Sequence, residues 1–315
     1  MSTAMFGRRN VVKMIAGAGV VGISGAGALW PGVAEAAAPA YDPAGKFDVD
    51  IREIPFRRNS AGRMLMARLY QPRGKGPFPA VIDLHGGAWN NKDRTAEQPM
   101  DHALAASGLL IVAIDMTLAP EAPYPACVQD ANYAVRWVKA NAAHWNGNAA
   151  RLGVYGSSSG GHVAELLAMR PHDPRYNAIP LAGDARIAWI ATRSPISDTV
   201  ARYENAEQHH RDGMIKANKI FFNPWETIHE SNPREILTRK EKITRVPFLI
   251  MQGALDDNMP PPAQENFAKL YQEAGGKCEF HLFEGAEHEW VAKEGPNTDK
   301  ARATVKAYIA QQLKA

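Results

Sequence analysis

The sequence predicts an α/β fold: a mostly parallel sheet of about eight strands, with helices on both faces and a small cap insertion. Strand-like and helix-like runs alternate from about Tyr41 to the C-terminus. The middle strand candidates are continuous apolar runs, such as residues 109–114, which suits strands buried on both faces of a parallel sheet. Such alternation is typical of right-handed βαβ crossovers.

The expected elements follow one another regularly until one segment interrupts them. The strand candidates are residues 49–56, 64–71, 80–84, 109–115, 152–156, 187–192, 247–252 and 278–283. Apolar residues recur at helical spacing in 128–138, 163–169, 267–274 and 301–309. Residues 199–245 are polar overall but contain several large apolar side chains, and we interpret them as an inserted cap: Met214, Ile215, Phe221, Phe222 and Trp225.

Composition and charge exclude several classes of protein. The chain has 315 residues, of which 45% are hydrophobic and 22% charged, as in ordinary soluble globular proteins. Cys127 and Cys278 are too few for a disulfide scaffold or a cysteine metal site, and we expect them not to pair. Three of the cations lie in residues 1–36 against one acid, so the rest carries only +1 of the formal +3. No basic surface is left to favour nucleic acid.

The first 36 residues resemble an export signal. Arg8-Arg9 precede an apolar stretch rich in glycine and alanine, and Ala34-Glu35-Ala36 offers small residues at a cleavage site. The paired arginines resemble a twin-arginine signal, so we expect the export machinery of that route as a partner and a periplasmic or secreted mature chain, residues 37–315. The alternative is an uncleaved anchor, but residues 14–29 are shorter than the roughly 20 apolar residues that span a bilayer. A G-x-G-x-x-G pattern at 17–22 lies inside this signal and does not indicate dinucleotide binding.

A nucleophile turn is predicted at Gly156-Ser157-Ser158-Ser159-Gly160. A short apolar strand precedes this G-x-S-x-G pattern and a helix-like run follows it, which is the context of a strained strand–turn–helix elbow. The central residue, Ser158, is the expected nucleophile. The alternative is a serine-rich loop that only caps a helix.

A serine nucleophile needs a base that is oriented by an acid. His288 follows the last strand, at the sheet edge where α/β proteins place their sites, and we expect it to be the base. Asp256 follows the preceding strand and is the expected acid, with the adjacent Asp257 as the alternative. Other titratable residues are expected to lie on a strand face, in the solvated cap or in a structural role: His281, His209, His210 and Asp198.

Acyl transfer also needs N–H donors for the oxyanion. Ser159 follows the nucleophile and should supply one. Gly87 and Ala88 follow an apolar strand within His85-Gly86-Gly87-Ala88-Trp89 and are the expected further donors.

With these motifs, the chain resembles the hormone-sensitive-lipase-like and feruloyl-esterase-like branch of the α/β-hydrolases over roughly residues 50–315. The resemblance rests on His85–Trp89, on Leu118-Ala119-Pro120-Glu121 with Tyr124-Pro125-Ala126, and on the elbow with its acid and histidine. The chain departs from the usual pattern at Met116 and Thr117, at Ala88 in place of a third glycine, and at Ser157 and Ser159 beside the nucleophile. Because alanine keeps its backbone N–H, only substrate preference is in question.

The resemblance implies an exported carboxylic ester hydrolase that forms an acyl-enzyme, without cofactor or metal and without stable membrane insertion. Its substrate would be a small-molecule ester, either small or aromatic-bearing, in contact with the following residues: Trp89, Phe221, Phe222 and Trp225. An amide or formamide hydrolase using the same triad is the first alternative. The other is a non-catalytic binding protein on the same fold.

Overall fold

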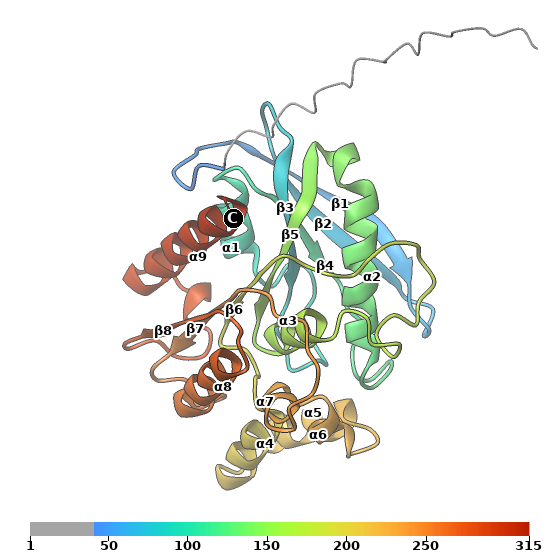
Figure 1. The fold of residues 1–315 in the computed structure, drawn as a ribbon, viewed down its shortest axis with the longest axis vertical. Helices are drawn as coiled ribbons and strands as arrows, with labels where there is room; N and C mark the ends of the chain where they lie inside the picture. Colours follow the sequence, from blue (N-terminus) through green and yellow to red (C-terminus); the bar gives the residue numbers. More distant parts are fainter. Residues whose placement is uncertain (1–40, 315) are drawn as a thin grey trace, which may run out of the picture. The chain divides into compact units, whose positions relative to one another are not determined.

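An eight-stranded sheet forms the centre of the computed structural model, which describes residues 41–314 (Figure 1). The strand order is β1-β2-β4-β3-β5-β6-β7-β8; β1 and β2 are antiparallel to their neighbours, and β3 to β8 run parallel. The α/β-hydrolase fold and all eight strands are thus confirmed. Their bounds are β1 Val49–Arg58, β2 Met64–Pro72, β3 Phe78–Leu84, β4 Leu110–Ile114, β5 Gly147–Ser157, β6 Ile190–Arg193, β7 Phe248–Gly253 and β8 Cys278–Phe283.

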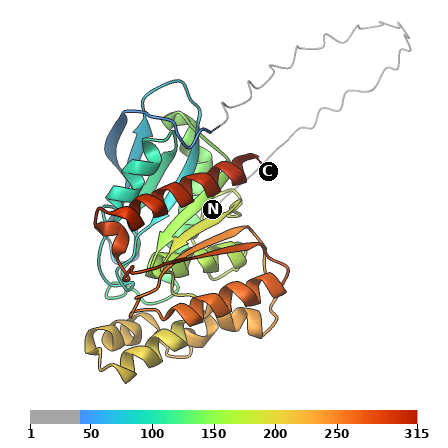
Figure 2. The same cartoon turned by 90° about the vertical axis from the view of Figure 1, so that its left-hand side faces the viewer.

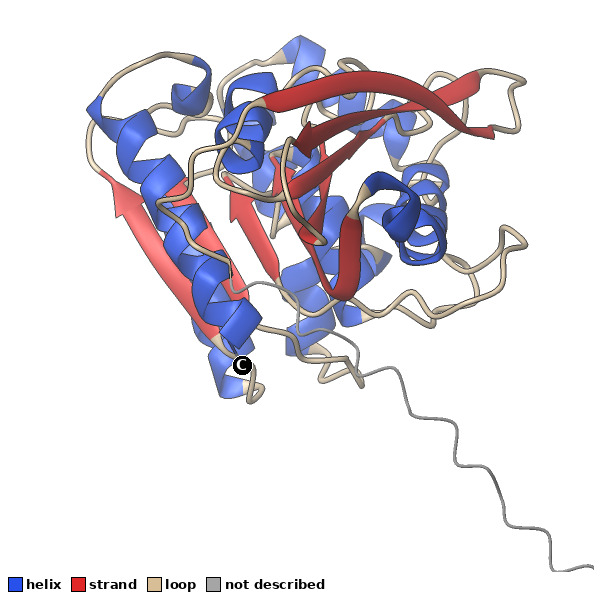
Figure 3. Cartoon of the chain, turned by 90° about the horizontal axis from the view of Figure 1, so that it is seen from above, coloured by secondary structure: helices blue, strands red, loops and turns tan. Residues whose placement is uncertain are grey.

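Helices cover both faces of the sheet (Figures 2 and 3). One face packs against α2 (Ala126–Asn141), α3 (Ser159–Met169) and α8 (Pro261–Glu273), and the other against α1 (Gln98–Ala105) and α9 (Pro296–Lys314). Strand β4 shows why its run is apolar throughout. Leu110, Val112 and Ile114 enter the first apolar cluster, whereas the alternate residues Ile111 and Ala113 enter the second.

The segment between β6 and β7 forms four short helices that gather at one end of the sheet (Figures 1 and 2). They are α4 (Thr199–Gln208), α5 (Asp212–Phe221), α6 (Thr227–Glu230) and α7 (Pro233–Thr238). The Asp198 side chain caps α4 by accepting from the Ala201 N–H, and Asn232 caps α7 in the same way. These residues occupy the predicted cap segment, and we call them the cap.

The structure adds a few elements to those predicted. Helix α1 has Pro99 in its first turn and contains only eight residues, which is too short for a clear apolar periodicity. Strand β5 begins at Gly147 because Gly147 and Asn148 pair with the start of β3. Two single turns of 3-10 helix, η1 (Ala142–Trp145) and η2 (Trp290–Ala292), complete the chain. As expected, both cysteines are buried and free.

Across residues 41–314, no helix combines the length and the apolar character that a bilayer crossing requires. The export signal predicted at residues 1–36 lies outside the described residues.

One carboxyl group makes the core sensitive to pH. Glu165 in α3 is fully buried, accepts one hydrogen bond of 2.7 Å from the Ser197 hydroxyl, and has an Oε2 without a partner among the described residues. Burial raises the pKa of Glu165 to about 8. The unfolded chain releases this proton near a pKa of about 4.3, so the folded protein loses stability as the pH rises from that value towards the folded pKa.

Glu165→Gln should therefore become progressively more stable than the wild type between pH 5 and 8. The difference in unfolding free energy should grow by up to about 1.4 kcal/mol per pH unit, because glutamine cannot ionise. Urea unfolding at several pH values measures it. The exposed Glu273→Gln is the matched control, and its curve should run parallel to that of the wild type. A constant offset for Glu165→Gln across this range would contradict the prediction.

Candidate active site

Ser158 occupies a strained turn between β5 and α3. Its φ and ψ are 51° and −119°, which a non-glycine residue adopts only when its surroundings enforce it. A Cβ on Gly160 would lie 2.0 Å from the carbonyl oxygen of Leu84, and one on Gly156 would lie 2.8 Å from the Gly160 oxygen. The turn can therefore close only with glycine two residues to either side of Ser158, as the sequence predicted.

The structure brings Ser158, His288 and Asp256 together. The Ser158 hydroxyl donates to His288 Nε2 at 2.9 Å, and His288 Nδ1 donates to Asp256 Oδ2 at 2.8 Å. His288 lies after β8 and Asp256 after β7, and those strands are paired up to Gly253 and Phe283. All three residues are buried. This is the geometry in which a histidine removes the serine proton while a carboxylate orients the ring.

Asp256 is held in its ionised form. Burial raises the pKa of this carboxyl, but the hydrogen bond and charge of His288 and the N–H of Met259 outweigh burial, so its pKa lies below the usual value. The Asn258 N–H and the Gln252 amide donate to it as well, at 3.0 and 2.9 Å. The carboxylate can therefore stabilise an imidazolium at neutral pH.

The loop after β3, residues 85–89, passes beside the nucleophile. Because Leu84 pairs with Gly156, β3 and β5 end side by side, and a Cβ on Gly86 would lie 3.2 Å from that of Ser158. Gly87, Ala88 and Trp89 all have positive φ values, of 109°, 51° and 60°. Among the described residues, the N–H groups of Gly87, Ala88 and Ser159 donate to no acceptor. These N–H groups are available to an oxyanion, and we call residues 85–89 the candidate oxyanion loop; that the groups bind an oxyanion stays a prediction.

A buried ion pair, which the sequence analysis missed, joins the elbow to the histidine loop. Arg193, at the end of β6, donates to the His288 carbonyl oxygen at 2.6 Å and to Glu97 Oε1 at 3.1 Å. The Ser157 hydroxyl donates to the same Glu97 oxygen at 2.5 Å, and the Ser158 N–H donates to the Arg193 carbonyl at 2.9 Å. Arg193 thus holds both the nucleophile and the base. No local motif marks it, because its partners are far apart in the sequence.

The titratable residues that the sequence analysis assigned to other roles lie outside the triad. Asp257 is exposed and forms an ion pair with Arg211, so the triad does not use it. His281 lies on β8, and His209 and His210 are exposed in the cap. Asp198 is the N-terminal capping residue of helix α4, as described above.

Of the four aromatic residues predicted to bind substrate, three are buried against one another and the fourth, Trp225, is partly exposed. The Trp89 and Phe221 rings stack at 4.5 Å and 4°, and Phe222 packs edge-on against both. Phe221 and Phe222 are 1% exposed, so they tie the cap to the oxyanion loop instead of lining an open pocket. Trp225 is 37% exposed and packs on Tyr203. Substrate contact of these rings stays a prediction.

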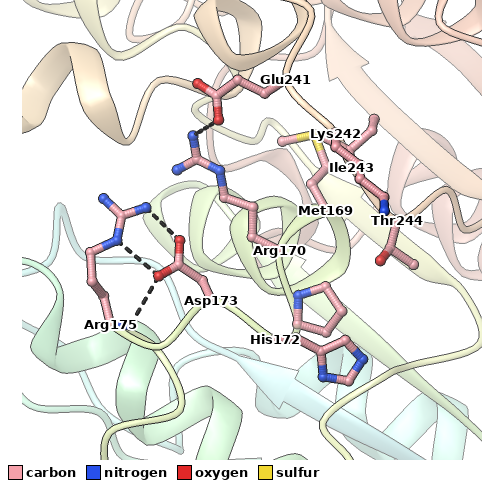
Figure 4. Close-up of a pocket in the computed structure, with 10 residues that line it drawn as sticks. Met169, Arg170, His172, Asp173, Arg175, Glu241, Lys242, Ile243 and Thr244 are labelled. Carbon is pink, nitrogen blue, oxygen red and sulfur yellow. Dashed lines mark hydrogen bonds and ion pairs between the residues drawn. The ribbon is translucent and has the colours of Figure 1, made fainter.

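A surface cavity away from the triad lacks its chemistry. Figure 4 shows this cavity of about 360 Å³, which is lined by residues of the segments 169–175 and 241–244. Its arginines are paired with carboxylates: Arg170 with Glu241, and Arg175 with Asp173. Among residues 41–314, no group of three or more His, Cys, Asp or Glu side chains is placed to hold a metal ion.

Comparison with known proteins places these features in a family. The BD-FAE family model matches residues 68–270. Carboxylesterase NlhH of Mycobacterium tuberculosis is 36% identical over 106 residues, 33% of each chain, and esterase LipC of the same organism is 24% identical over 75% of this chain and 59% of its own. The matched part thus spans about a third to three fifths of these relatives.

Solved structures show the same fold at low identity. Esterase B from Lactobacillus rhamnosis superimposes with a TM-score of 0.73 at 18% identity, covering 87% of this chain and 89% of its own. Propionate-bound esterase 2 from Thermogutta terrifontis gives 0.64 at 20%, covering 86% and 95%.

Separate replacement of Asp256 and of its neighbour Asp257 tests which carboxylate belongs to the triad. Asp256→Asn should slow phosphonylation of Ser158 by a fluorophosphonate roughly 10³- to 10⁴-fold, because the amide cannot stabilise the imidazolium. Asp257→Asn, at the neighbouring exposed position, is the matched control and should react as the wild type does. Labelling rates followed by intact mass measure both variants. Equal rates for the two variants would contradict the assignment.

Proposed function

The chain belongs to the BD-FAE family, and on this basis we propose that it hydrolyses carboxylic esters through Ser158, His288 and Asp256. The hydrogen-bonded chain of these three side chains beside unpaired backbone N–H groups carries the proposal. The two relatives are a carboxylesterase and an esterase by name, which favours an ester over an amide or formamide.

The proposed acylation and deacylation steps use the atoms that the hydrogen-bonded triad brings together. Ser158 Oγ attacks the ester carbonyl while its proton passes to His288 Nε2, and Asp256 stabilises the imidazolium. The N–H groups of Gly87, Ala88 and Ser159 receive the oxyanion. His288 then protonates the leaving alcohol, which leaves an acyl-serine. Water, deprotonated by His288, attacks this acyl group, and the serine regains its proton as the carboxylic acid departs.

We propose small substrates, because Ser158 is 4% exposed and the cap packs on the oxyanion loop through Trp89 and Phe221. The Thermogutta esterase with propionate or butyrate bound supports a short acyl chain. Trp89 and Trp225 are the rings that an aromatic ester would meet.

We further propose export by the twin-arginine route, with the mature chain in the periplasm or outside the cell. The proposal is supported by Arg8-Arg9, the weakly apolar stretch after them and Ala34-Glu35-Ala36.

Labelling and hydrolysis together test the activity. The wild type should take one fluorophosphonate adduct and hydrolyse phenyl acetate, and Ser158→Ala should do neither. Ser159→Ala is the matched control for a neighbouring hydroxyl; it keeps its backbone N–H and should still be labelled. Faster cleavage of acetanilide than of phenyl acetate would favour the amide alternative. A folded wild type that takes no adduct and cleaves neither substrate would favour the non-catalytic alternative.

Export can be tested separately. In cells with a twin-arginine system, the mature chain should begin near Ala37 and occur in the soluble periplasm. The double substitution Arg8→Lys and Arg9→Lys should retain the precursor inside the cell, because the export machinery recognises the paired arginines. Fractionation followed by N-terminal mass analysis measures this. Full-length protein in the membrane fraction would favour the uncleaved anchor.

A further inference from the structure

Arg202 in α4 is a buried cation without a counter-ion. Its side chain is 1% exposed, and no carboxylate of the described residues forms an ion pair with it. Arg202 Nε donates to the Asn258 side-chain oxygen at 2.9 Å, whereas its Nη1 has no acceptor among the described residues. Burial lowers the pKa of Arg202 to about 10, while the Asp256 carboxylate raises it, and the guanidinium stays protonated at neutral pH.

The other buried arginines of the described chain have carboxylate or carbonyl partners for most of their donors. Arg193 is paired with Glu97, and Arg170 with Glu230 and Glu241. Arg136 has no carboxylate, but it donates to the carbonyl oxygens of Ile179 and Leu181 and to Asn132, so each of its nitrogens has an acceptor. Arg193 also keeps an unpaired Nε, but its charge is met by Glu97. Among residues 41–314, Arg202 is thus the buried arginine that combines an open donor with no carboxylate partner.

Arg202 also lies between two loops of the candidate active site. Its guanidinium carbon is 5.2 Å from the centre of the Trp89 ring, in the oxyanion loop. Its acceptor, Asn258, is two residues beyond Asp256 and donates its own N–H to that carboxylate. The cation is thus supplied by the cap to the loops that carry the oxyanion donors and the acid.

Neither neighbour neutralises the charge. An aromatic face compensates only part of the cost of burying a cation, and an amide oxygen carries no net charge. The Asp256 carboxylate favours the Arg202 charge, but it is hydrogen-bonded to His288 and forms no ion pair with Arg202, so it compensates the charge only in part. Arg211, the other charged group that acts on Arg202, is a cation. A planar guanidinium with free donors is matched best by a carboxylate.

We propose that Arg202 binds a carboxylate carried by the substrate, so that the preferred substrates are small esters bearing a free acid group. The inference rests on the proposed function and names its substrate class. The acid can belong to the acyl part, as in a half-ester of a short dicarboxylic acid, or to the alcohol part, and the two cases share the same recognition.

Pairs of nearly isosteric esters test the proposal on the wild-type protein. Monoethyl succinate is compared with ethyl succinamate for an acid on the acyl side, and carboxymethyl acetate with its amide for an acid on the alcohol side. In at least one pair, kcat/KM should be about 10- to 100-fold higher for the acid, as expected for a charge-assisted hydrogen bond in a buried site. Half-esters of malonate and glutarate then report the preferred spacing.

Variants assign the preference to this residue. Arg202→Gln should reduce the acid-to-amide ratio of kcat/KM towards one, and Arg202→Lys should retain part of it because the charge remains. Lys216→Gln is the matched control, since Lys216 is an exposed cation of the same cap and its loss should leave the ratio unchanged. In the wild type, succinate should also protect Ser158 from a fluorophosphonate better than succinamide does, a measurement that needs no variant.

The outcomes are distinct. Equal kcat/KM for acid and amide in both pairs, together with equal protection, would overturn the proposal even if Arg202→Gln does not fold. An unchanged ratio in a folded Arg202→Gln would show that this residue only packs against Trp89. Hydrolysis of neither acid nor neutral esters by a folded wild type would remove the proposed function and this inference with it.

Discussion

The strained turn at Ser158 is the constraint on which the site depends. A non-glycine residue at φ 51° costs of order 1–3 kcal/mol, so surrounding contacts must hold it. The Ser158 N–H donates to Arg193, its carbonyl accepts from the His162 N–H, and Gly160 packs directly on Leu84. Because these partners are backbone groups of β6, α3 and β3, the hydroxyl is positioned by the sheet itself.

The histidine is tied to the same framework by a buried charge. Arg193 and Glu97 are almost fully buried, and breaking such a pair by removing one partner typically costs about 3–5 kcal/mol. The pair fixes the carbonyl of His288 relative to Ser157 and Glu97, so the position of the base relative to the nucleophile is set by buried groups.

The features of the fold and the site that could be predicted from the sequence are those that local patterns encode. Buried parallel strands are continuous apolar runs, and the elbow needs glycines at fixed spacing, so the strands, Ser158 and the loops with Asp256 and His288 could be located. The pair of Arg193 with Glu97 could not, since it depends on β5 and β6 lying in register and on a partner nearly a hundred residues away. For Phe221 and Phe222 the sequence shows only an aromatic pair in a polar segment, a pattern that does not reveal that both rings are buried and pack on Trp89.

The cap therefore contacts Trp89 through two different residues. Phe221 stacks on Trp89, and the Arg202 guanidinium lies over the same ring, so a cap helix and a cap cation both act on the residue that follows the oxyanion donors. Trp89 has a positive φ, and its N–H donates to the Ser159 hydroxyl at 3.3 Å. Stacking with Arg202 returns about 0.5–2 kcal/mol, less than the several kcal/mol that burying an ion costs. Trp89 and the Asp256 carboxylate thus compensate the Arg202 charge only in part, and a bound anion would complete the compensation. An anion bound there would lie beside the loop that carries Gly87 and Ala88, so binding energy gained away from the reacting carbonyl would be available to order the oxyanion donors.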